Sequence, residues 1–174
     1  KLIIKNAHIT NAGSNNGPWN RHDLNFACEV ELTDVISEKA IALAANATLT
    51  NVTINDKNTS DTYALWVKPN GQTVTLNGCV IDMIDCSDGR GISINDQYVD
   101  SPAKVTLNVS NTVFKTEEKS AIIVKSTAGA DITLNNVDIT AVSADNVNAV
   151  WVDADRSAAY DLVNVVGGTK FQEQ

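Results

Sequence analysis

The stretch Leu49-Thr50-Asn51-Val52-Thr53-Ile54 decides the fold that this sequence predicts. An apolar residue stands two positions before its asparagine, and two others stand one and three positions after it. Alternate residues of a strand face the same side, so these apolar side chains share one side only if the chain bends at Asn51. Asparagine tolerates the left-handed backbone that such a bend uses. The stretch therefore predicts two short strands joined by a corner.

The same pattern recurs along the chain. Its predicted corners are Asn6, Asp34, Asn51, Gly78, Asn111, Asn136 and Asn164. A second pattern, a small residue followed by two apolar residues with one position between them, starts at Ala40, Ala64, Gly91, Ala121 and Ala149. Successive starts are 24 to 30 residues apart. A drifting period of this kind indicates fixed strands joined by turns of variable length.

Together the patterns predict an all-β fold, a right-handed parallel β-helix solenoid of about six to seven coils with three short strands per coil. Coils stacked at about 4.8 Å place like residues over like. Cys79 falls on an inward position, so we expect a buried thiol. The prediction of strands is least secure over 34–45. Weak helical periodicity there makes a helical turn the alternative. We expect residues 1–174 to form a single domain, which can be a fragment of a longer extracellular protein.

Strands such as Gly91-Ile92-Ser93-Ile94, with the asparagine corners, resemble the pectate-lyase-like (pectin-lyase-fold) superfamily of right-handed β-helices. The resemblance covers Leu2 to about Val166. That superfamily includes polysaccharide lyases and hydrolases, phage tailspikes and bacterial adhesins, so it implies a fold more than an activity. It leads us to expect a non-catalytic, adhesin-like bacterial member.

Composition narrows the classes of function. The net charge of -8 and the scattered Lys and Arg residues argue against nucleic-acid binding, which depends on clustered cations. The sequence contains no run of 18 apolar residues, so it predicts no membrane-spanning helix. We expect a secreted or cell-surface protein.

An outward column of the predicted third strand carries Trp66, Ile123 and Trp151, with Lys68 and Lys125 beside it. Two exposed indole rings can stack on the sugars of a chain. We therefore expect this face to bind a polysaccharide, a host or cell-surface glycan, or a protein partner. The alternative is that a loop folds over the sheet and buries the tryptophans.

Asp82, Asp85 and Asp88 precede a strand that begins near Arg90. Carboxylates at this spacing can hold Ca²⁺, the only cofactor that the sequence suggests, in a small polysaccharide lyase. Aspartates are also common in turns for backbone reasons. The sequence lacks the paired carboxylates expected of the hydrolases in the superfamily that it resembles. We assign no catalytic residue and expect a binding module, with a lyase or a purely structural spacer as alternatives.

Overall fold

The computed structural model describes residues 1–10, 24–56, 63–84, 89–117, 120–142, 149–152 and 162–173. Every regular element among them is a β-strand, and every pairing between strands is parallel. The predicted all-β class is therefore confirmed. The helical alternative for 34–45 is wrong, because this stretch consists of the end of one strand, the whole strand Ile41–Leu43 and bends.

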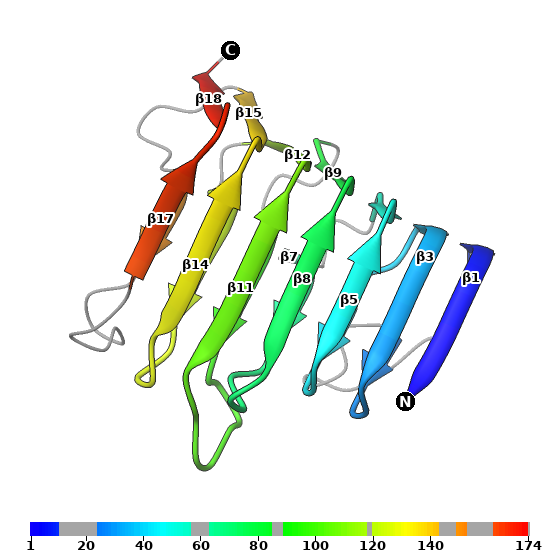
Figure 1. Ribbon diagram of the computed structural model, residues 1–174, viewed down its shortest axis with the longest axis vertical. Coiled ribbons are helices and arrows are strands. Elements are labelled where there is room, and N and C mark those ends of the chain that lie inside the picture. The colour runs from blue at the N-terminus through cyan, green and yellow to red at the C-terminus, as the bar shows by residue number, and fades with distance from the viewer. Residues whose placement is uncertain are drawn as a thin grey trace.

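The larger of two sheets divides into two arms. Its strands are β1 (Leu2–Ile9), β3 (Val30–Ser37), β5 (Ala47–Thr50), β6 (Thr53–Ile54), β8 (Thr73–Asn77), β9 (Val80–Met83), β11 (Val105–Ser110), β12 (Val113–Glu117), β14 (Ala130–Asn135), β15 (Asp138–Val142), β17 (Leu162–Val166) and β18 (Lys170–Glu173). β3 pairs with β5 before Asp34 and with β6 after it. The first arm continues through β5, β8, β11, β14 and β17, which lie side by side in Figure 1. The second arm continues through β6, β9, β12, β15 and β18.

The second sheet has six strands. They are β2 (Leu24–Phe26), β4 (Ile41–Leu43), β7 (Tyr63–Val67), β10 (Arg90–Asn95), β13 (Ile122–Lys125) and β16 (Val150–Val152). The chain visits the first arm, the second arm and the second sheet in turn, as in β8, β9 and β10, and then repeats the order. Each strand thus pairs with strands one repeat away in the sequence.

Three inward columns, which the stacking of like residues predicts, are confirmed by the strand register. Leu49, Leu76, Val109 and Leu134 are successive partners in the first arm, and Ile54, Ile81, Phe114 and Ile139 in the second. Leu65, Ile92, Ile122 and Val150 align in the second sheet. Nearly all of these side chains are buried in one hydrophobic core. Cys79 is buried with them, and its desolvation raises the pKa of the thiol.

The predicted corners adopt the left-handed backbone at six of seven positions. The φ angles are 52° at Asn6, 54° at Asp34, 53° at Asn51, 67° at Gly78, 49° at Asn111 and 53° at Asn136. The seventh prediction, Asn164, is wrong. Asn164 lies within β17 opposite Thr133, and the corner is Gly167, with a φ of 66°.

Side-chain amides link successive corners. The Asn136 amide nitrogen donates to the amide oxygen of Asn111 at 2.9 Å, and the Asn111 amide nitrogen donates to Asn77 at 2.9 Å. Asn51 donates in the same way to Asp34 at 3.1 Å. The bends at Asn51, Asn111 and Asn136 are therefore fixed twice, through backbone handedness and through side-chain hydrogen bonds between repeats.

Candidate functional site

The outward face of the first arm carries a regular array of small polar side chains, which we call the polar plate. Inward residues alternate with outward ones along each strand, so each strand contributes every second residue. The plate consists of Asn46, Thr48, Thr50, Thr73, Thr75, Asn77, Thr106, Asn108, Ser110, Thr133 and Asn135. All eleven are exposed or half-buried, and none is charged or aromatic. The next outward residue of β14 is acidic: Asp131 aligns with Thr106 at the end of the plate.

The plate is held in place from beneath and from the sides. Its strands are hydrogen-bonded to parallel neighbours, and the inward residues between its members are buried. Threonine has few side-chain conformers because it is branched at Cβ. The Ser110 hydroxyl also donates to the Asn77 amide oxygen at 3.1 Å. The donors and acceptors of the plate therefore occupy nearly fixed positions.

Charged residues border the plate in ion pairs. On the β3 side, Lys1 contacts both Glu29 and Glu31. On the β14 side, Lys104 lies 2.6 Å from a carboxylate oxygen of Asp131. The two lysines partly neutralise the three carboxylates of the border, because Lys1 is shared between Glu29 and Glu31.

The second sheet carries the outward column predicted from the sequence. Trp66 aligns with Ser93, Ser93 with Ile123, and Ile123 with Trp151. The predicted alignment is confirmed, whereas the predicted exposure is correct only for Trp151. Trp151 is 39% exposed, but Trp66 is 5% exposed and Ile123 only 1%. The column is therefore not a platform of two open indole rings.

Lysines accompany both tryptophans, as predicted. The Lys68 ammonium lies 4.9 Å from the Trp66 ring centroid, and Lys125 lies 5.3 Å from that of Trp151. Both distances fit cation–π contacts. The Trp66 indole also donates to the backbone carbonyl of Asn95 at 3.1 Å. Trp66 is thus an internal packing residue with a satisfied polar group, while Trp151 keeps an accessible ring.

Only one residue of the predicted metal cluster lies in the described part of the chain. Asp82, on β9, faces the Lys115 ammonium of β12 at 3.4 Å, so its neighbour across the strands is a cation. Asp85 and Asp88 lie outside the described residues. Within the described ranges, no three His, Cys, Asp or Glu residues are grouped so as to hold a metal ion.

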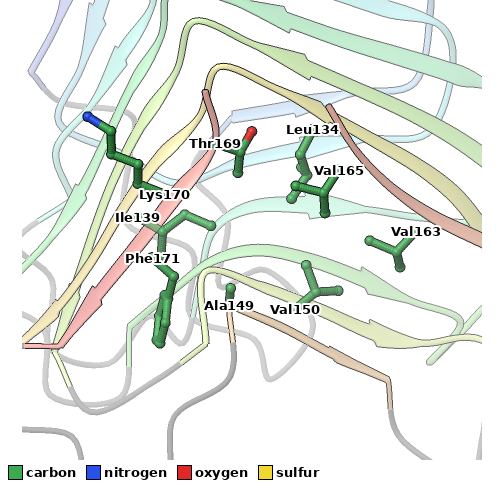
Figure 2. Close-up of a pocket in the computed structure, with 9 residues that line it drawn as sticks. All are labelled: Leu134, Ile139, Ala149, Val150, Val163, Val165, Thr169, Lys170 and Phe171. Atoms are coloured by element: carbon green, nitrogen blue, oxygen red, sulfur yellow. The ribbon is translucent and has the colours of Figure 1, made fainter. Parts of the chain in front are cut away.

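An apolar cavity of about 360 Å³ lies among β14 to β18 (Figure 2). Val163, Val165 and Phe171 line it, and all three pair with inward residues of the preceding repeat. Thr169 supplies the one hydroxyl group among the lining residues, and this hydroxyl already donates a hydrogen bond to the Val166 carbonyl at 3.2 Å. Lys170 also lines the cavity, but its amine points away from the other lining residues in Figure 2. The cavity therefore continues the core and does not collect the polar groups of a catalytic site.

No protein-family model, curated protein or solved structure matches the chain. Among the described residues, no helix is long and apolar enough to cross a membrane. The fold and site therefore define only a broad class, an all-β protein of parallel strands paired in register with a polar outward face on the first arm.

The polar plate was not identified from the sequence, although a signal for it is present. Thr48-Leu49-Thr50 and Thr73-Val74-Thr75-Leu76-Asn77 alternate polar and apolar residues. The apolar members predict the core. The polar residues of the same strands also align in columns, but this alignment can be recognised only when the strand register is known.

Proposed function

We propose that this chain is a right-handed parallel β-helix, of about six to seven coils with three strands each, and that it acts outside the cell as a non-catalytic polysaccharide-binding module. The repeated order of first arm, second arm and second sheet supports the solenoid. The asparagine corners support the resemblance to pectate-lyase-like proteins of bacterial surfaces. The module binds its ligand on the polar plate.

The observation that carries this proposal is the composition of the plate. Its eleven hydroxyl and amide side chains both donate and accept hydrogen bonds, as sugar hydroxyls do. A rigid surface loses little conformational entropy when it binds. The burial of Trp66 favours the plate over the tryptophan column, where Trp151 is the accessible ring.

The test is affinity electrophoresis in gels that contain soluble polysaccharides, neutral and acidic. We expect a neutral polymer to retard the wild-type protein and to retard Thr75→Lys/Thr133→Lys about tenfold less, because two plate hydrogen-bonding groups are lost. The control is Thr53→Lys/Thr140→Lys. It adds the same charge at half-buried threonines of the second arm and leaves retardation unchanged.

Other outcomes contradict the proposal. Loss of binding only in Trp151→Ala assigns the ligand to the tryptophan column. Unsaturated products from uronate polymers, formed only with Ca²⁺, establish a lyase. Binding to no polysaccharide, soluble or crystalline, supports the structural spacer.

A further inference from the structure

We infer that the polar plate binds the planar face of an uncharged, crystalline polysaccharide in preference to a single soluble chain. This inference rests on the proposed function and specifies its ligand. It follows from the shape, charge, size and regularity of the plate.

The shape of the plate suits a flat ligand. Four adjacent strands supply it, and Figure 1 shows β5, β8, β11 and β14 side by side with nearly the same direction. The plate residues are small, and no large side chain rises among them. Sites for single small ligands are concave and enclose most of the ligand. A flat face leaves half of a lone chain in water, whereas a crystal face presents a matching plane.

The charge of the plate suits an uncharged ligand. None of its eleven side chains is ionised, and Asp131, which aligns with Thr106 at one end of the plate, is paired with Lys104. Recognition of uronates or sulfated sugars uses Arg or Lys in charge-assisted hydrogen bonds. The plate offers no such group.

The regularity of the plate favours a periodic ligand. Thr48, Thr75, Asn108 and Thr133 form one outward column, with successive members on neighbouring strands. Their spacing is about 4.8 Å between strands and roughly 6.6 Å between alternate residues of one strand. Hydrogen bonds between neutral groups in water are individually weak, so affinity requires many at once. A crystal face, whose hydroxyls also repeat, engages several columns together.

The size of the plate argues against a stable protein partner. Four strands and five residues at these spacings cover roughly 300 Å². A stable protein interface buries about 800 Å² on each partner. A polymer surface can instead hold many copies of a small site, and sites joined in one larger protein gain avidity on it.

The experiment measures depletion of the protein from solution by microcrystalline cellulose and by α-chitin, with hydroxyethylcellulose and chito-oligosaccharides as soluble competitors. We expect wild-type protein to bind one of the crystalline solids and soluble forms to compete at least about tenfold less well, because they engage fewer columns. Thr75→Lys/Thr133→Lys lowers retention by about tenfold, whereas the control Thr53→Lys/Thr140→Lys binds like wild type. Circular dichroism establishes that both variants are folded.

The failures are distinguishable. Equal or tighter binding of the soluble polymers overturns this inference and leaves the proposed function standing. Binding to neither form overturns both. Thermal hysteresis of ice growth without binding to either solid also overturns the inference, because the plate then orders water and not sugar.

Discussion

At the scale of single residues, the corner asparagines combine a backbone role with a side-chain role. Asn111 has a φ of 49°, donates to Asn77 and accepts from Asn136. We expect Asn111→Ala to lower the free energy of unfolding by about 2 kcal/mol, since alanine is strained in the left-handed region and makes neither hydrogen bond. Urea denaturation followed by circular dichroism measures the loss.

Asn111→Gly separates the two roles. Glycine adopts a positive φ without strain and lacks only the amide, so we expect it to lose about half as much stability as Asn111→Ala. Equal losses in the two variants would show that the amide ladder, and not backbone handedness, fixes this corner.

The fate of particular residues shows how far the sequence predicts the fold. The corner pattern, with asparagine at four positions, aspartate at one and glycine at one, identified six corners, because few residues tolerate a positive φ. It failed at Asn164, where the strand continues to Val166 and the chain turns at Gly167-Gly168. The last repeat also has one residue more than its neighbour between corner and strand, since Asp138 pairs with Lys170. Sequence alternation alone does not reveal such an insertion.

The candidate site was less predictable than the core. The predicted alignment of Trp66 with Trp151 was correct, but the predicted exposure of Trp66 was not. The burial of an outward residue depends on what packs over it. That cover is set by turns of variable length, which the repeat does not specify. The polar plate depends instead on which outward residues align across strands, and this requires the register.

At the scale of elements, the second arm and the second sheet approach each other closely at Gly91. A Cβ atom there would lie 2.7 Å from Phe114 Cδ1 and would overlap the Ala121 carbonyl oxygen. Phe114 is large where its column neighbours are isoleucines, and Gly91 is smaller than its partner Ala64. The absence of a side chain at Gly91 therefore leaves the space that the Phe114 ring occupies.

We expect Gly91→Ala to destabilise the protein by about 2 kcal/mol, because a methyl group is forced into a filled space. The matched change Ala64→Gly in the adjacent repeat removes a methyl group instead and costs about 1 kcal/mol. Phe114→Ile in the Gly91→Ala background restores part of the loss. Chemical denaturation of the four proteins tests this, and a Gly91→Ala variant as stable as wild type refutes the predicted overlap.

At the scale of the whole molecule, repeats contact mainly their neighbours, so the stability of a column depends on position along the stack. Most strand contacts join β-strands one repeat apart. An inward residue in a middle strand is covered on both sides, whereas one in an outermost strand is covered on one side. Val109 and Val165 share the first-arm column and differ in this respect: they are 1% and 60% exposed.

The same substitution at these two valines measures that difference directly. Val109→Ala removes buried methyl groups and leaves a cavity, so we expect it to cost about 2 kcal/mol. Val165→Ala removes surface that water already contacts and should cost less than about 0.5 kcal/mol. Urea denaturation gives both values under identical conditions. Equal costs would mean that Val165 is as well covered in solution as Val109, and hence that another layer packs on β17.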